Sequence, residues 1–170
     1  AVTIDGKDIC YIKDDEEGVG DIPSFLRIEK SKQSTIFAIN FDAPHWDGVG
    51  HFRVLFHIMD EFKLLQTLKI RNETFLRFLS EVSQSYKKVP YHNWRHAVDV
   101  TQFVAYQVKL TKLDLSLTKI QLFCLFVAAI LHDVNHDGFT NVFNEKAETP
   151  LGILFKNQSV METHHCQVAI

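Results

Sequence analysis

The amino-acid sequence predicts a mostly α-helical protein, and two observations carry this prediction. From His51 onward, apolar residues recur at steps of three and four, which is the spacing of a helix with one buried face. Residues that favour helix N-caps precede several of these segments, and proline or glycine follows others. Histidine-rich motifs then fall at the expected helix ends, next to apolar segments.

The first 50 residues differ from the rest of the chain. They hold five of the seven glycines and two of the four prolines. We therefore interpret residues 1–50 as an N-terminal wrap or linker segment and place the domain at 51–170. The acidic run 14–17 is expected to be a solvated turn. Residues 35–39 could form a short strand, although no partner strand is evident.

The first two predicted helices lie between residues 51 and 90. In the first, apolar residues repeat with helical spacing from Phe52 to Leu65. The second follows Asn72, whose side chain suits an N-cap. Pro90 is expected to end this segment, because proline lacks the backbone N–H that a helix interior needs.

Two longer helices are predicted next. Asn93 can cap a helix that runs through Leu110, and Ser116 can cap the following one. That helix contains the apolar run 122–131 and reaches His132. The run is about half of the roughly 20 residues that a membrane span needs, so we interpret it as a buried helix.

The last predicted helix opens at Ser159. Gly138 is expected to break the preceding helix within a turn of the second histidine motif. The run from Ser159 to Glu162 has the pattern of a capping box, in which the serine and glutamate side chains each bond the other's backbone N–H.

The composition is that of an ordinary globular protein. Apolar residues make up 46% and charged residues 23%, and the net charge of −3 argues against a nucleic-acid partner. Cys10, Cys124 and Cys166 form no zinc-type pair, and their odd number suits a reducing compartment. We therefore expect a cytoplasmic protein without a secretory leader or transmembrane segment, although other domains could recruit it to a membrane. Cys124 lies in an apolar run and is expected to be a core residue.

Two histidine motifs carry the chemistry. They are Tyr91-His92-Asn93-Trp94-Arg95-His96 and His132-Asp133-Val134-Asn135-His136, and on a helix their i, i+4 spacing would put both rings on one face. We expect His96, His132 and Asp133 to bind a divalent metal, because imidazole and carboxylate suit zinc and related ions. Asp133 has two oxygens and can bridge two ions, which together can activate a hydroxide against a phosphoryl group. A set of core or capping polar residues is the alternative.

His92 is predicted to act as an acid rather than a ligand. It precedes the first turn of its helix, so its ring need not point in the direction of His96. A protonated imidazole can donate to the departing oxygen of a phosphoester. A loop histidine without a chemical role is the alternative, and for nearby Asp99 a structural role is favoured.

Glu162, His164 and His165 form a third polar cluster. Neighbouring helix residues point about 100° apart, so at most one of the two rings faces a given site easily. Glu162 could bind water near a metal, and a plain surface helix start is an equal alternative. The remaining histidines fit no metal spacing and are interpreted as structural: His45, His51 and His57.

Together the motifs resemble the catalytic domain of class I 3′,5′-cyclic-nucleotide phosphodiesterases. The resemblance rests on the order and spacing of Tyr91, His92, Asn93, His96, Ala97, Asp99 and Val100, and of Ala129, His132, Asp133, His136, Gly138 and Asn141. Val89-Pro90 and the run 159–165 match family segments too, so the resemblance covers roughly 51–170.

The resemblance implies a compact all-α fold of the HD type that hydrolyses cyclic AMP or cyclic GMP to the 5′-monophosphate. His92 matches the family's proton donor to the leaving O3′. His96, His132 and Asp133 match the ligands of a tightly held metal, usually zinc. Asp133 also matches the bridge to a second metal, usually magnesium or manganese.

Three more positions take a role from the resemblance. His136 and Glu162 match residues that contact metal-bound water or phosphate, and Tyr91 matches a wall of the substrate pocket. Asn135 stands where many members have aspartate, and Asp137 where proline or arginine is common. These departures suggest a divergent member of protozoan type.

The family domain continues well past the length seen here. We therefore expect 51–170 to be the N-terminal part of a catalytic domain that is inactive alone, with one aspartate ligand, the purine-binding glutamine and the regulatory domains outside this chain. A broader HD-type metal-dependent nucleotide phosphohydrolase is one rival, which the His132-Asp133 pair supports equally and the His92 motif does not. A catalytically inactive binding module is the other, and the intact ligand set speaks against it.

Overall fold

The structure is a computed structural model that describes residues 2–4, 7–9, 22–46, 48–156 and 158–170. It confirms the predicted all-α fold class. The main body consists of α2 (Val49–Glu61), α3 (Leu64–Thr67), α4 (Asn72–Ser85), α5 (Trp94–Thr111) and α6 (Lys119–Leu131). A short antiparallel ribbon of β1 (Val2–Ile4) and β2 (Lys7–Ile9) is also present.

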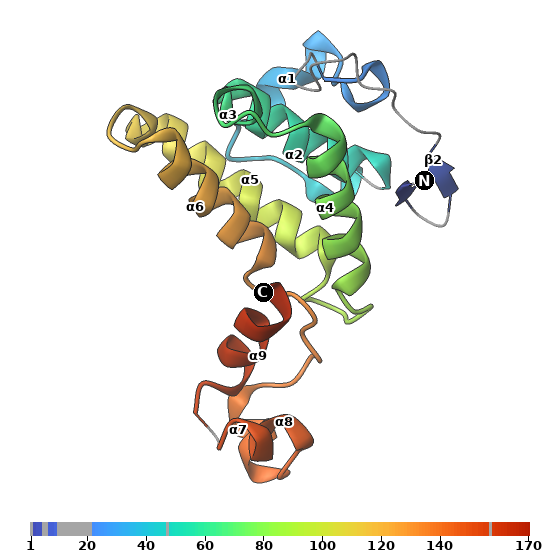
Figure 1. The fold of residues 1–170 in the computed structure, drawn as a ribbon, viewed down its shortest axis with the longest axis vertical. Coiled ribbons are helices and arrows are strands. Elements are labelled where there is room, and N and C mark those ends of the chain that lie inside the picture. The colour runs from blue at the N-terminus through green and yellow to red at the C-terminus, as the bar shows by residue number, and fades with distance from the viewer. Residues whose placement is uncertain (1, 5–6, 10–21, 47, 157) are drawn as a thin grey trace.

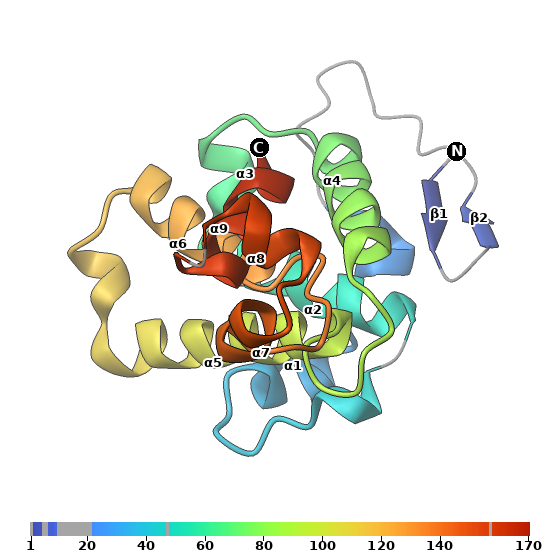
Figure 2. The same cartoon turned by 90° about the horizontal axis from the view of Figure 1, so that it is seen from below.

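A smaller group of helices follows the main body. It consists of α7 (Asn141–Lys146), α8 (Pro150–Leu154) and α9 (Val160–Ala169). Figure 1 shows this group at one end of the long axis, below the ends of α5 and α6. Figure 2, seen from that end, shows α7, α8 and α9 in front of the main body. The junction between the two groups is where the second histidine motif lies.

The described part of the N-terminal segment packs on the main body. It forms the single-turn helices η1 (Ser24–Leu26) and η2 (Ala43–His45) and the helix α1 (Lys30–Ile36). Arg53 of α2 donates from Nε to the carbonyl of Phe25 at 2.7 Å, and Gln102 of α5 donates from Nε2 to the carbonyl of Ile36 at 2.7 Å. Leu26 and Ile36 are buried with the core. The interpretation of 1–50 as a wrap or linker segment stays a prediction.

The predicted strand over residues 35–39 is wrong. Thr35 and Ile36 are the last residues of α1, and Phe37 is its C-cap. The chain then turns, with the N–H of Ala38 donating to the carbonyl of Thr35 at 3.3 Å. A strand here would need a partner for its backbone groups, whereas a helix and a turn bond these groups locally.

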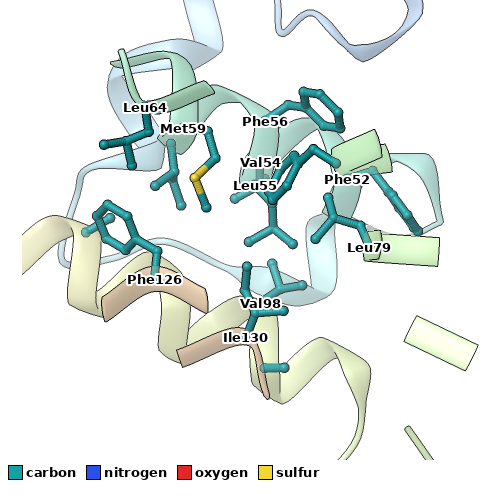
Figure 3. Packing of buried hydrophobic residues seen from close by; sticks show 14 of the residues in the cluster. Phe52, Val54, Leu55, Phe56, Met59, Leu64, Leu79, Val98, Phe126 and Ile130 are labelled. Atoms are coloured by element: carbon teal, nitrogen blue, oxygen red, sulfur yellow. The ribbon is translucent and has the colours of Figure 1, made fainter. Parts of the chain in front are cut away.

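The core lies where α2, α4, α5 and α6 meet. Figure 3 shows Leu55 of α2 pointing toward Val98 of α5 and Ile130 of α6. The buried rings of Phe56 and Phe75 join α2 to α4, with centroids 5.1 Å apart. Burying each large apolar side chain stabilises the fold by about 1.5–3 kcal/mol. This packing holds together the ends of α5 and α6 that carry the two motifs.

Helix α6 is buried along one face only. Leu122, Phe126, Ala129 and Ile130 have helical spacing and are buried, whereas Cys124 on another face is exposed. The prediction that Cys124 is a core residue is therefore wrong, because an apolar run does not reveal which face meets the core. The described residues contain no helix with the length and apolar character that crossing a membrane requires.

Two predicted caps lie beside the histidine motifs. Asn93 is confirmed as the N-cap of α5, where its Oδ1 accepts from the backbone N–H of His96 at 3.3 Å. Ser116 is not the cap of α6, which begins after Thr118. Thr118 and Gln121 form a capping box, and this reciprocal pair bonds two N–H groups that Ser116 would leave unpaired.

Two other predicted caps are displaced. Asn72 is the first residue of α4 and is buried, and Arg71 occupies the N-cap position. Ser159 precedes α9 but forms no capping bond, because its φ of 42° departs from the extended backbone of an N-cap. Asn141 of α7 takes this role, since its Oδ1 accepts from the N–H of Met161 at 2.9 Å. The capping box predicted at the start of α9 is therefore wrong.

Candidate metal centre

The two motifs meet where α5 begins and α6 ends. His96 lies in the first turn of α5, and His132 is the C-cap of α6. Helix α6 ends at Leu131, before the predicted break at Gly138, and Asn135 adopts a left-handed φ of 60°. The second motif is therefore a turn rather than a helix, and the expectation that its two histidines share a helix face is wrong.

His96, His132 and Asp133 form a first group of possible metal ligands. Their ligand atoms lie within 4.8 Å of one another. Asp133 Oδ2 is 3.4 Å from His96 Nε2 and 3.2 Å from His132 Nε2. His132 Nδ1 lies 2.8 Å from the carbonyl of Ala129, and donation to that carbonyl leaves the lone pair of Nε2 facing the group. The structure thus brings together the three ligands predicted from the sequence.

Asp133, His136 and His165 form a second group with the same spread of ligand atoms. Asp133 Oδ1, the other carboxylate oxygen, lies 3.6 Å from His165 Nε2. His165 Nδ1 donates to the carbonyl of Val134 at 2.7 Å, so its Nε2 lone pair also faces the carboxylate. The two oxygens of Asp133 therefore face different groups of histidines.

His136 differs from the other histidines in its hydrogen bonding. Its Nδ1 accepts from the backbone N–H of Gly138 at 2.9 Å. The proton of the neutral ring then lies on Nε2, which makes that atom a donor, so Asp133 and His165 are the members of the second group that remain free to ligate. The ring of His136 is buried and stacks on His92 with centroids 4.0 Å apart. This arrangement fits a residue that donates to an anion beside the metals.

His92 precedes α5, as predicted, and lies at the edge of the site. Its Nε2 is 4.0 Å from Asp133 Oδ2, and its side chain is 37% exposed. The ring of Tyr91 lies 4.9 Å from His92 and 4.6 Å from His96, and this tyrosine is 65% exposed. Both side chains can therefore be reached from solvent.

Glu162 belongs to neither group of ligands. It is exposed, and its Oε2 accepts from Asn141 Nδ2 at 2.9 Å. Asp99 is exposed on α5. His165, which has no role in the sequence prediction, is buried against Asp133, whereas His164 points to Asn135. The adjacent pair His164-His165 indicated that one histidine could enter the site. The orientation of α9 in the structure shows that it is His165.

The charge state of the site suits metal ligation. Burial alone would raise the pKa of Asp133, but the hydrogen bond and charge of His132, with the charges of His92 and His136, lower it to about 2. Burial, then the charge of His132, lowers the pKa of His96. Although burial opposes it, the hydrogen bond to Asp133 and the bond to the carbonyl of Ala129 raise the pKa of His132. A cation would compete with a proton for the lone pair of His132 Nε2.

The donor set fits divalent metals. Two imidazole nitrogens and one carboxylate oxygen are ligands that zinc accepts, and three protein ligands leave positions open for water or substrate. The split of the Asp133 oxygens between two groups fits a pair of ions.

A cleft of about 1240 Å³ is lined in part by the loop before α5. Its lining includes His51, Trp94, Lys88 and Arg95, and none of the residues of the two ligand groups. The cleft is therefore distinct from the metal centre.

Comparisons with known proteins agree on one family. Residues 91–170 match the family described as 3′5′-cyclic nucleotide phosphodiesterase. The high affinity cGMP-specific 3′,5′-cyclic phosphodiesterase 9A of Mus musculus is 31% identical over 152 residues, which cover 88% of this chain and 28% of the relative. The cGMP-specific 3′,5′-cyclic phosphodiesterase of Drosophila melanogaster is 34% identical over 113 residues, which cover 66% of this chain and 10% of the relative.

A solved structure matches as well. The phosphodiesterase domain of the rhodopsin phosphodiesterase of Salpingoeca rosetta superposes with a TM-score of 0.76 and 29% sequence identity. The match covers 82% of this chain and 42% of that domain. The chain thus spans less than a third of the curated relatives and less than half of the solved domain.

Proposed function

The chain belongs to the class I 3′,5′-cyclic-nucleotide phosphodiesterase family, and from that premise we propose that the protein hydrolyses 3′,5′-cyclic nucleotides to 5′-monophosphates. One observation carries the proposal: the two oxygens of Asp133 face two groups of histidines, and His92 lies 4.0 Å away. Cyclic GMP is the substrate to test first, because two relatives are named as specific for it.

We assign the proton donor to His92. Its partly exposed ring can meet a substrate at the open side of the site, and its Nε2 lies 4.0 Å from Asp133 Oδ2, beside the proposed metals. Breaking the P–O3′ bond places negative charge on O3′, and a proton from His92 Nε2 would neutralise it. General acid catalysis of this kind contributes roughly 10²–10⁴-fold to the rate.

We assign one metal to His96, His132 and Asp133, and a second to the Oδ1 side of Asp133. The donor set supports zinc at the first position. We take magnesium or manganese at the second position from the family resemblance, with Asp133 supplying a carboxylate oxygen to it. When bound, such ions neutralise phosphoryl charge and lower the pKa of bound water to roughly 7. Asp133, which belongs to both groups, would hold the two ions next to each other.

Three further residues would contact the substrate or its surroundings. His136 would donate from Nε2 to the phosphate, in keeping with the bond that its Nδ1 accepts from Gly138. Tyr91 would form part of the pocket wall beside His92 and His96. Glu162 would act from the rim, where Asn141 holds its carboxylate.

We propose residues 51–170 as the N-terminal part of the catalytic domain and 1–50 as a segment that wraps it. Regulatory domains would lie elsewhere in the protein, and the protein would act in the cytoplasm. The longer relatives are consistent with further domains.

The test is hydrolysis of cyclic GMP and cyclic AMP by the whole protein. His92→Ala should lower kcat by about 10²–10⁴-fold while metal content stays constant. Asp133→Ala should abolish turnover together with metal binding. His45→Ala is the matched control, since His45 is an exposed histidine that pairs with Asp42.

The outcomes separate the proposal from its rivals. Wild-type turnover by the Asp133→Ala variant would refute the shared-carboxylate role. Hydrolysis of other nucleotides but not of cyclic ones would indicate a broader phosphohydrolase. Bound metal without any turnover would indicate a binding module.

A further inference from the structure

We infer that Tyr86, Asn135 and His164 form a hydrogen-bonded brace that positions Asp133 for metal binding. The inference rests on the proposed metal centre and adds three positioning residues to it. None of the three belongs to either group of metal ligands. Tyr86 is the C-cap of α4, Asn135 lies in the turn after α6 and His164 lies in α9, and the three converge on the turn that carries Asp133.

The turn needs support because it lies outside any helix. Helix α6 ends at Leu131, so Asp133 lacks the neighbouring turns that hold a helical residue. Within the turn, the N–H of Val134 donates to the carbonyl of Leu131 at 3.0 Å, and the N–H of His136 donates to the carbonyl of Asp133 at 3.1 Å. Neither of these two hydrogen bonds involves the backbone N–H of Asp133.

Tyr86 supplies the bond to Asp133. Its hydroxyl donates to the carbonyl of Ile130 at 2.8 Å and accepts from the N–H of Asp133 at 3.3 Å. The Tyr86 hydroxyl thus links Ile130, in the last turn of α6, to Asp133, just after the helix ends. Tyr86 is only 6% exposed, and its ring packs 6.0 Å from Trp94 at the start of α5. The phenol therefore fixes the end of α6 to the loop that carries His92.

Asn135 supplies the second bond of the brace. Its Nδ2 donates to the carbonyl of Ser85 at 3.3 Å, while its Oδ1 accepts from His164 Nε2 at 3.0 Å. An amide performs both functions at once, whereas a carboxylate can only accept. Asparagine also tolerates the left-handed φ of 60° found here. Asn135 is one of the two positions where this sequence departs from the family pattern, and its amide makes two distinct bonds.

His164 completes the brace from α9. It lies next to His165, whose Nε2 faces Asp133 Oδ1 at 3.6 Å. The bond to Asn135 fixes the rotation of α9 at this point and so directs His165 toward the carboxylate. Because Asp133 serves both ligand groups, a shift of the turn changes both at once.

The test is titration of the whole protein with Co²⁺, followed by visible absorption, which reports affinity and ligand geometry. Tyr86→Phe removes one hydroxyl and keeps the ring. It should weaken Co²⁺ binding by about 10–100-fold, the effect typical of residues that orient metal ligands, and change the absorption band. Tyr106→Phe, on α5 outside the brace, should leave affinity and spectrum as in the wild type.

A second pair of variants tests the brace independently. His164→Leu removes the donor to Asn135 and should weaken Co²⁺ binding, whereas His164→Gln keeps a donor near the position of Nε2 and should restore much of it. If both Tyr86→Phe and His164→Leu bound Co²⁺ with wild-type affinity and spectrum, the brace would be refuted and the metal centre would stand. Absence of saturable Co²⁺ binding by the wild type would refute the metal centre, and the brace with it.

Discussion

Replacing Asn93 by alanine should destabilise the fold and disturb the metal centre together. The side chain caps α5 by accepting from the N–H of His96, and its Nδ2 donates to the carbonyls of Val89 and Pro90 at 3.0 and 3.3 Å. Losing the cap costs about 1 kcal/mol, and each lost hydrogen bond costs about 0.5–1.5 kcal/mol net. We take the sum as roughly 2 kcal/mol, because the two donations share one amide group.

Thermal unfolding followed by circular dichroism measures this loss. For a chain of 170 residues, about 2 kcal/mol corresponds to a fall in Tm of about 4–8 °C. Asn93→Asp keeps the accepting oxygen but not the donations, so its Tm should fall by about half as much. Both variants should also bind Co²⁺ more weakly than the wild type, because the loop before His96 loses its anchor.

Thr118→Ala is the matched control for the loss of a cap. Thr118 caps α6 at the end opposite the metal centre, so this variant should lose stability without losing Co²⁺ affinity. If Asn93→Ala unfolded at the wild-type temperature, or if it bound Co²⁺ as tightly as the wild type, the reasoning about this loop would be refuted.

Three further outcomes are expected. Phe126→Ala empties a fully buried position in α6 and should lower the free energy of unfolding by about 3–5 kcal/mol, measured by urea titration, whereas the same change at exposed Phe103 should cost little. The pKa of Asp133 is about 2, below its ordinary value of 3.8, so its ionised form stabilises the fold above about pH 4, and this contribution is lost as the pH falls toward 2. Asp133→Asn should therefore flatten the acid limb of a Tm-against-pH curve, and an unchanged limb would contradict this assignment. Zinc should raise the Tm of the wild type, a chelator should reverse the rise, and His96→Ala should abolish it.

Local signals in the sequence predict much of the α5 region. Asn93 is a cap because its side chain bonds an N–H three residues away, and such a bond needs no other part of the fold. At other helices, several nearby residues could serve as the N-cap, and the sequence alone does not show which one does. Thr118 replaces Ser116 because Gln121 completes a capping box with it. At the start of α9, the capping oxygen comes from Asn141, 20 residues before the N–H that it accepts from.

Tertiary packing determines which face of a helix is buried and which side chain enters the site, and the local sequence pattern does not. Cys124 and Phe126 lie in the same apolar run, yet the core covers only the face that carries Phe126. The sequence also predicts Asp133 as the shared ligand, but it cannot choose between His164 and His165. That choice depends on how α9 packs against the turn after α6, a contact between segments about 30 residues apart.

We propose that Asp133 shares its carboxylate between two metal ions. Crystals of the protein grown with zinc and measured at the zinc absorption edge would locate both ions. We expect one anomalous peak within about 2.0–2.2 Å of His96, His132 and Asp133 Oδ2, and a second on the Oδ1 side near His165. Zinc bound elsewhere, with Asp133 free of metal, would refute the sharing of this carboxylate.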